Sequence, residues 1–139
     1  MSDENKAVMR RFVEEVVNGR RTAPLAELVA ADVVDHTPVP MQAPGADGLQ
    51  QALAYLRVAF PYARSTEQEI AAEGDLVVYR GALSGRHTGE FLKLQPTGRA
   101  FEITEVRLAR IRDGRITEHR WLPDLAALLS QLGAVPASA

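Results

Sequence analysis

Apolar residues recur at helical spacing through the first sixty residues of the chain. Val8, Phe12 and Val16 repeat every four residues, and charged residues fill the other side of the same segment. This pattern predicts a helix over 2–18, and the same reasoning predicts helices over 23–30 and 47–60 with a short strand over 33–36 between them.

The second half of the chain changes to the period of two that is typical of strands. Residues 66–121 are rich in β-branched and aromatic residues and are interrupted by the turn signals Gly74-Asp75, Pro96-Thr97-Gly98 and Asp113-Gly114. A last helix is predicted over 124–132, with Gly133 as its C-terminal stop. Helices followed by an antiparallel meander predict an α+β fold in a single domain, 1–139, with helices on one face of a curved sheet.

Asp113-Gly114 predicts a hairpin, because a type I′ turn needs positive φ at both central residues. A two-residue turn places Leu108 opposite His119 and Val106 opposite Trp121, and alternation then assigns every side chain to a face. One face carries Val106, Leu108, Arg110, Thr117, His119 and Trp121, and the other carries Glu105, Arg107, Ala109, Ile111, Ile116, Glu118 and Arg120. The first set mixes large apolar groups with an imidazole and a guanidinium, as the lining of a pocket does.

Composition removes several classes of function. A chain of 139 residues with 46% hydrophobic and 24% charged residues is typical of a globular domain with a real core. The net charge of -2 and the scattered arginines give no reason to expect nucleic acid. The lack of cysteine excludes disulfides, thiol nucleophiles and Cys-ligated metals. No apolar run approaches the roughly 20 residues of a membrane helix, and the N-terminus is polar, so we expect a cytoplasmic protein without a membrane partner.

The peptides VDHTP, AEGDLVVYRGALSGRHTGEF, PTGRAFE and RIRDGRITEHRWLPDLAALLSQLG resemble the SnoaL-like polyketide cyclase family, and the resemblance extends from Asn5 to Gly133. It implies the nuclear transport factor 2-like fold, a cone-shaped curved antiparallel sheet with N-terminal helices packed on its concave face. Family members close rings of polyketides by intramolecular aldol condensation without a cofactor or a metal. Relatives on this fold include epoxide hydrolases, isomerases, hydroxylation partners and proteins without known activity.

The resemblance also assigns residues. The family's acid/base aspartate falls on Asp124, and its pocket histidines fall on His36, His87 and His119. The chain departs from the family pattern at Arg120, where a tryptophan usually follows the histidine, and at Phe12 or Val13, where a tyrosine is often found. Both departures bear on the substrate more than on the fold.

Two interpretations of Asp124 remain open. Aspartate is favoured as the N-cap of a helix, and the following segment PDLAALLSQL has a helical pattern. As a catalytic base, the same aspartate would lie in an apolar cavity, where lost solvation raises the pKa of a carboxyl. It would then take a C–H proton from between two carbonyls, and the resulting enolate would attack a ketone of the same molecule.

The other candidates also carry a plain alternative. His119 is either a structural histidine or a group that protonates the developing alkoxide, His36 is either a turn residue or pocket lining, and His87 lies where a strand bends. Arg110 either lies at a rim with its head in water or pairs with Asp124 or Asp35 to hold a water molecule, as in epoxide hydrolases of this fold. Trp121, Leu108, Phe60, Tyr79 and Phe91 are predicted to line the cavity, where each could equally be plain core. No histidine shows short metal-ligand spacing, so no metal is expected.

Three functions follow from these patterns. The first is a cofactor-independent polyketide cyclase with Asp124 and His119 as acid/base groups and a hydrophobic small-molecule substrate. The second adds water to an epoxide through Asp124 and Arg110. The third is a non-catalytic binding protein. The predicted outer face of the hairpin mixes charges with Ile111 and Ile116, which suits a homodimer formed through this face.

Overall fold

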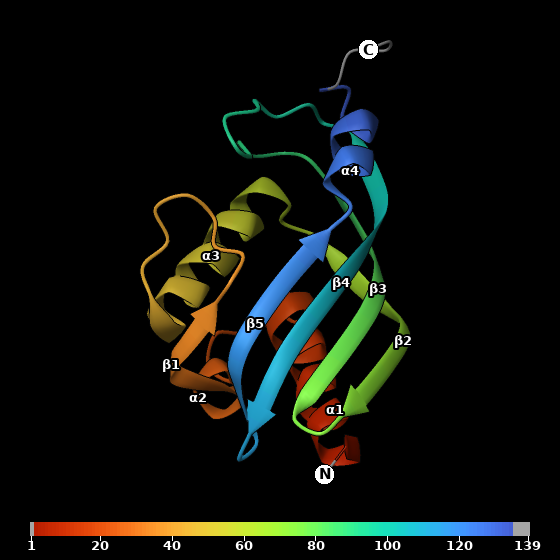
Figure 1. Cartoon of the computed structure of the whole chain (residues 1–139). Helices are drawn as coiled ribbons and strands as arrows, with labels where there is room; N and C mark the ends of the chain where they lie inside the picture. The colour runs from red at the N-terminus through yellow and green to blue at the C-terminus, as the bar shows by residue number, and fades with distance from the viewer. Residues whose placement is uncertain (1, 135–139) are drawn as a thin grey trace.

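The computed structural model describes residues 2–134, so Met1 and residues 135–139 of the predicted domain lie outside the described part. The helices are α1 (Ser2–Arg11), the π-helix η1 (Phe12–Asn18), α2 (Leu25–Leu28), α3 (Gly45–Ala59) and α4 (Leu125–Gln131). The strands are β1 (Val29–Asp35), β2 (Arg64–Glu73), β3 (Leu76–Arg86), β4 (Ala100–Arg112) and β5 (Arg115–Pro123), as Figure 1 shows. Within residues 2–134, no helix is both long enough and apolar enough to span a membrane.

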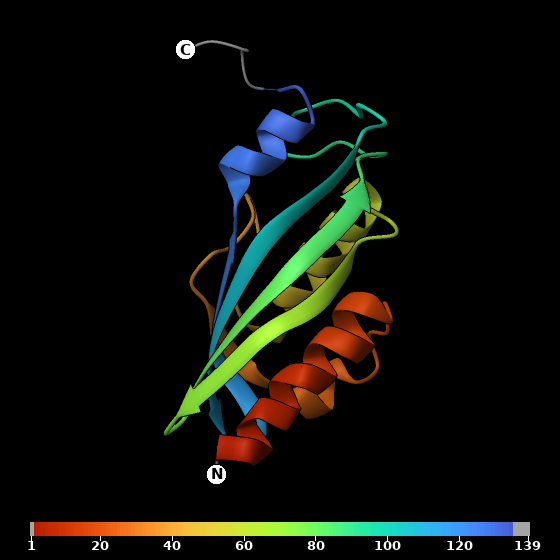
Figure 2. The same ribbon diagram turned by 90° about the vertical axis from the view of Figure 1, so that its right-hand side faces the viewer.

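One sheet contains all five strands, in the order β1-β5-β4-β3-β2. Strands β2 to β5 form the predicted antiparallel meander, and β1 adds to β5 in parallel. Figure 2 shows α1, η1 and α3 on one side of this long curved sheet, while α4 continues beyond the end of β5. The predicted α+β architecture, with the N-terminal helices on one face, is confirmed.

The first predicted helix is present with a change of helix type, and the second is shorter than predicted. The helix predicted over 2–18 is present, but its second half is π-helical, a wider coil that often occurs at functional sites. The helix predicted over 23–30 is wrong at its C-terminal end, because helical structure stops at Leu28 and β1 begins at Val29. The pairing of Val29 with Ile116 of β5 outweighs local helix propensity there.

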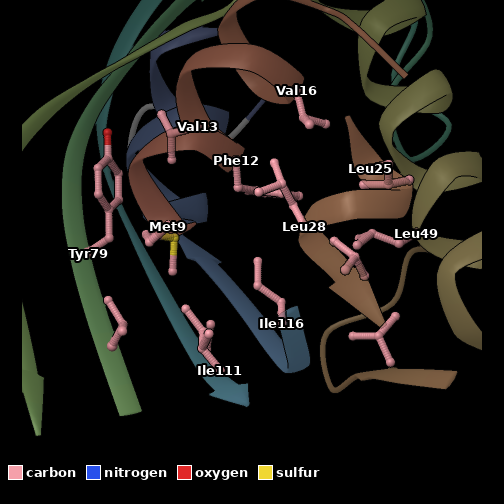
Figure 3. Packing of buried hydrophobic residues seen from close by; sticks show 14 residues of the cluster. Met9, Phe12, Val13, Val16, Leu25, Leu28, Leu49, Tyr79, Ile111 and Ile116 are labelled. Carbon is pink, nitrogen blue, oxygen red and sulfur yellow. The ribbon is translucent and has the colours of Figure 1, made fainter. Parts of the chain in front are cut away.

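The main core lies between the N-terminal helices and the end of the sheet that is drawn at the bottom of Figure 1. Figure 3 shows Phe12 and Val13 of η1 above the strands that carry Tyr79 and Ile116, and Val16 on the side of Leu25; all six are buried. A second buried cluster forms where α4 meets the other end of the sheet, from Ala59, Phe60, Leu83, Phe91, Phe101, Ile103, Leu128 and Leu132.

A β-bulge beside the predicted turn changes the hairpin. The turn itself is as predicted, with φ of 52° at Asp113 and 75° at Gly114. Ile111 pairs with Ile116, but Arg110 then pairs with Glu118, so that Thr117 is the additional residue. The Thr117 hydroxyl donates to the Arg110 carbonyl at 3.2 Å. A bulge leaves the outer part of one strand shifted by one residue against its partner.

The bulge reverses the two faces that were predicted for β4. His119 pairs with Ala109 and Trp121 pairs with Arg107. His119 and Trp121 still point toward the helices, as predicted. The assignment for β4 is wrong, because the residues directed inward are Glu105, Arg107, Ala109 and Ile111, and those directed outward are Val106, Leu108 and Arg110. The predicted outward position of Ile116 on β5 is also wrong, because Ile116 is fully buried in the main core.

Candidate functional site

A cavity lies between η1, α3 and the inner face of β1, β4 and β5. Its volume is about 80 Å³, which is room for several water molecules. Most of its wall is apolar, from Phe12, Val16, Leu49, Leu53, Leu56 and Phe60 among others. The polar groups on its wall are Asp35, Thr37, Arg107, His119 and Trp121, with Arg20 and Arg57 toward the solvent. A mainly apolar hollow with a few convergent polar groups is the usual form of a small-molecule site.

His119 and Asp35 meet because β1 and β5 are parallel neighbours in which these two residues pair. Nδ1 of His119 lies 3.7 Å from Oδ1 of Asp35, slightly beyond hydrogen-bond length. Neither ring nitrogen of His119 has a hydrogen-bond partner, although the residue is only 3% exposed. Buried polar atoms without partners are rare in folded proteins, so this imidazole is available to a ligand.

Electrostatics keep the His119 ring neutral. Burial lowers the pKa of His119, and although Asp35 opposes this effect, the positive charge of Arg107 adds to it. A neutral imidazole with its proton on Nδ1, facing Asp35, presents a free lone pair at Nε2. Such a nitrogen can accept a proton from a substrate held in the cavity.

Asp35 is held as a carboxylate by its neighbours. Burial by itself raises the pKa of Asp35, but the His119 ring, the Gln42 amide and the Thr37 backbone together hold it well below its usual range. Gln42 Nε2 donates at 2.8 Å and Thr37 N at 3.1 Å. The Thr37 hydroxyl in turn accepts a hydrogen bond from Trp121 N at 2.8 Å, which links this loop to β5.

Arg107 of the cavity wall forms a buried ion pair with Glu105, which lies behind the wall. Arg107 Nη2 donates to Glu105 Oε1 at 3.0 Å, and Glu105 is fully buried. Burial raises the pKa of Glu105, but the charge of Arg107 and hydrogen bonds from Ser65, Trp121 and Arg107 outweigh it, so the pKa is lowered overall. Trp121 Nε1 donates to Glu105 Oε1 at 2.7 Å.

The Arg107 guanidinium is therefore fixed in place. Its Cζ lies 5.9 Å from the ring centroid of Phe12 and 5.7 Å from that of Trp121, both within cation–π range. Glu105 holds it on a third side. A positive charge fixed in this way beside an apolar cavity can stabilise a negative oxygen that develops there.

Three predicted cavity residues lie on the cavity wall: His119, Trp121 and Phe60. Asp124 does not. It is exposed at the N-terminus of α4, where its Oδ1 accepts a hydrogen bond from Ala127 N at 3.1 Å. The N-cap interpretation of Asp124 is confirmed and its expected place within an apolar cavity is wrong, because β5 carries the chain past the cavity before α4 begins. The carboxylate in the cavity is that of Asp35.

The remaining predicted site residues lie elsewhere. On the outer side of the sheet, Arg110 pairs with Asp75 at 2.6 Å and His36 pairs with Glu118 at 2.9 Å, while Leu108 points away from the helices. The proposed pairing of Arg110 with Asp124 or Asp35 is therefore wrong.

Three others are buried away from the cavity. His87 is fully buried against Phe60, and Phe91 packs in the same second cluster. Tyr79 is part of the main core, where its hydroxyl bonds to Ser65 at 2.8 Å. For these residues the plain core alternative is what the structure shows.

Arg107 and Glu105 were missed because the bulge at Thr117 reverses the face of β4. The signal that could have found them is the alternation of β4 itself, in which Phe101, Ile103, Ala109 and Ile111 lie on their side of the strand. Residues 2–134 contain no group of three or more His, Cys, Asp or Glu side chains placed to hold a metal ion.

Comparisons with known proteins show the family to which the chain is similar. A family model described as SnoaL-like polyketide cyclase matches residues 7–132. The chain is 32% identical over 132 residues to the aklanonic acid methyl ester cyclase DnrD of Streptomyces peucetius, covering 91% of this chain and 88% of that protein. It is 38% identical over 90 residues to the nogalonic acid methyl ester cyclase of Streptomyces nogalater, covering 64% and 67%. The structure of IdmH from Streptomyces antibioticus superposes with a TM-score of 0.81 at 34% identity, covering 93% of this chain and 98% of IdmH.

Proposed function

The chain belongs to the SnoaL-like polyketide cyclase family, and from this premise we propose that it closes a ring of a hydrophobic polyketide by an intramolecular aldol reaction, with His119 and Asp35 as its acid–base pair. The observation that carries the proposal is a buried imidazole with two unbonded nitrogens, 3.7 Å from a carboxylate, on the wall of an apolar cavity.

The proposed reaction needs one proton acceptor. His119 Nε2 takes a proton from the carbon between two carbonyls of the substrate, and Asp35 stabilises the imidazolium that forms. The enolate carbon attacks a ketone of the same molecule and forms the new C–C bond. The imidazolium then returns the proton to the alkoxide, so the protein is unchanged and no atom is gained or lost.

Arg107 is the group proposed to stabilise the negative oxygen. The enolate and alkoxide oxygens carry charge only during the reaction, and a fixed cation on the cavity wall lowers the energy of such states. Its charge also disfavours a protonated His119 in the resting protein, which keeps the base free. The charge of Arg107 therefore favours both the neutral His119 before the reaction and the negative oxygen that forms during it.

The substrate class follows from the relatives. Two of them are named for aklanonic and nogalonic acid methyl esters, so we propose an aromatic polyketide of the same kind for this chain. An apolar wall that includes Phe12, Leu53 and Phe60 suits a flat hydrophobic ring system. Because the cavity of about 80 Å³ is small for several fused rings, binding requires side chains at its mouth to move outward.

A direct test compares two aspartates. Asp35→Asn removes the partner of His119 and should lower kcat on aklanonic acid, supplied as the free acid or as its methyl ester, by about 100-fold or more. Asp124→Asn keeps a good N-cap and should leave kcat and thermal stability close to those of the unsubstituted protein. If Asp124→Asn abolished turnover while Asp35→Asn did not, the acid–base role would pass to Asp124.

A bound apolar ligand that is never turned over would instead support the non-catalytic alternative. Trp121, the single tryptophan of the chain, lies on the cavity wall and reports on binding independently of turnover through its fluorescence. Binding without turnover of any substrate tried would overturn the cyclase proposal and keep the site.

We also propose a homodimer through the outer sheet face. After the correction at the bulge, this face carries Val78, Val106, Leu108 and Leu122, of which Leu122 is 47% exposed. The same face also carries the charged residues Arg110, Glu118 and Arg120. A mass in solution equal to one chain would contradict the dimer, and Leu108→Glu should separate it into monomers.

A further inference from the structure

Two arginine side chains, Arg20 and Arg57, line the cavity and are more exposed to solvent than His119 on the same wall. Arg20 follows η1 directly after Gly19, and Arg57 lies on α3, where it bonds to Val16 and Thr22 on either side of Arg20 in the chain. Arg57 bonds to Thr22 and the Val16 carbonyl, and Arg20 lies over the Tyr62 ring, so these partners are neutral. Among residues 2–134, no carboxylate forms an ion pair with either arginine. The cavity therefore opens through a positively charged mouth.

Arg57 is half-buried with donors to spare. Its Nη2 donates to the Val16 carbonyl at 3.0 Å, and its Nη1 reaches the Thr22 hydroxyl at 3.5 Å. A guanidinium has five N–H donors, so most of them remain for a ligand. Burial lowers the pKa of Arg57, and the charge on Arg20 lowers it further. The pair is thus an arrangement of like charges that an anion would stabilise.

Arg20 is held at this place against local preference. Its φ is +54°, a left-handed conformation that favours glycine over residues with a side chain. Its guanidinium lies over the ring of Tyr62, with Cζ 5.0 Å from the ring centroid. The contact with Tyr62 holds the Arg20 side chain beside the cavity.

We propose that Arg20 and Arg57 bind a carboxylate of the substrate, so that this chain acts on a polyketide free acid, whereas its relatives are named for methyl esters. The inference rests on the proposed function and adds the substrate's chemical form. Guanidinium groups bind carboxylates through paired, charge-assisted hydrogen bonds, which an ester cannot match because it carries no charge. The apolar part of the substrate then extends along Leu53 and Phe60 toward His119.

A phosphate would satisfy the same two guanidiniums, and it could come from the phosphopantetheine arm of a carrier protein. The reaction proposed above is compatible with either anion. The free acid is the source we argue for, because both arginines belong to the wall of the cavity itself rather than to a surface beside it. An anion attached to the ring system reaches them from inside.

The test measures binding by quenching of Trp121 fluorescence, with 9,10-anthraquinone-2-carboxylate and its methyl ester as probes. The unsubstituted protein should bind the acid about tenfold more tightly than the ester, the size expected for charge-assisted hydrogen bonds at a half-buried site. The double variant Arg20→Gly with Arg57→Gln should abolish that preference, because it should lower the affinity for the acid and leave the affinity for the ester unchanged. Arg21→Gln is the matched control, since Arg21 is the exposed neighbour outside the cavity wall, and it should change neither affinity.

Arg20→Gly alone guards against a misfolded double variant. Glycine suits φ of +54°, so the fold should be kept or slightly stabilised while part of the preference for the acid is lost. Equal affinity for acid and ester in the unsubstituted protein, or a preference that survives in the double variant, would overturn the proposal.

Two further outcomes are decisive. Arginine-dependent binding of 4′-phosphopantetheine, without a preference for the carboxylate probe, would overturn the free acid in favour of a carrier-bound substrate. If turnover requires Asp35 and His119 but is indifferent to both arginines, this inference fails and the proposed function stands. If turnover is absent while the arginine-dependent preference is present, the proposed function fails and the anion site stands.

Discussion

The chain contains two fully or almost fully buried histidines, and they differ in what surrounds them. His119, 3% exposed, lies on a cavity wall 3.7 Å from Asp35, and neither of its ring nitrogens is bonded. His87, 0% exposed, lies in the second cluster, where its Nδ1 accepts from Thr97 N at 3.2 Å and contacts the Thr97 hydroxyl at 3.1 Å.

The difference shows that burial alone does not make a site. His87 anchors a long loop: its backbone N–H donates to Arg99, and its carbonyl accepts from Gly98. The Nδ1 atom and both backbone groups of His87 bond within this loop, so His87 is a structural residue. Nε2 of His87 also lacks a hydrogen-bond partner, so an unbonded nitrogen alone does not separate the two histidines. His119 has in addition an ionised neighbour and space for a ligand, and chemistry requires these as well.

The largest expected effect separates the two histidines directly. His119→Gln removes the proposed base and should lower kcat by about 100- to 10,000-fold, with a folded circular dichroism spectrum. His87→Gln should leave kcat within about threefold and lower the free energy of unfolding by about 1–2 kcal/mol through the lost bonds to Thr97. Loss of turnover in His87→Gln, without loss of folded protein, would contradict the comparison.

A second experiment compares how the two regions are held together. The cavity wall rests on the buried pair of Glu105 and Arg107, whereas the His87 region is held by neutral contacts. Glu105→Ala leaves Arg107 buried without a counter-charge and should lower the free energy of unfolding by about 3–5 kcal/mol in urea denaturation. Glu102→Ala, an exposed position on the same strand, should change it by less than about 0.5 kcal/mol. Equal effects at the two positions would mean that the ion pair does not support the wall.

The pH dependence offers a finer test. Because burial lowers the pKa of His119, the acid limb of kcat/KM should lie below pH 6.5, the ordinary value for a histidine. Asp35 raises that pKa, so the limb should move to still lower pH in Asp35→Asn, in whatever activity remains. A limb that moved to higher pH would contradict the assignment of Asp35.

The same group affects stability in a defined direction. A histidine whose pKa is lower in the folded state takes up a proton more readily when unfolded, so folding stability falls as the pH falls below 6.5. His119→Gln should flatten this dependence between pH 6.5 and the lowered pKa. Thermal melts across that interval measure the effect, and an unchanged slope would mean that His119 does not titrate as proposed.

The order of the elements and part of the inner surface could be predicted from the amino-acid pattern. The spacing of Val8, Phe12 and Val16 predicted the first helix, and Asp113-Gly114 predicted the hairpin turn. The motif residues predicted the family that the comparisons then showed. His119 and Trp121 were placed correctly because they lie on one strand, where alternation from a neighbour suffices.

The groups that meet at the site are brought together by packing between segments distant in the chain. The bulge at Thr117 exchanged Arg110 for Arg107, since one additional residue in β5 reverses the predicted facing of β4, and the turn residues do not reveal that extra residue. Asp35 approaches His119 through the parallel pairing of β1 with β5, two strands far apart in the chain. Asp124 lies at a helix N-terminus in solvent, because the path of the chain after β5 depends on how α4 packs. A sequence fixes which chemical groups are present and their local facing, but distances between segments come from packing.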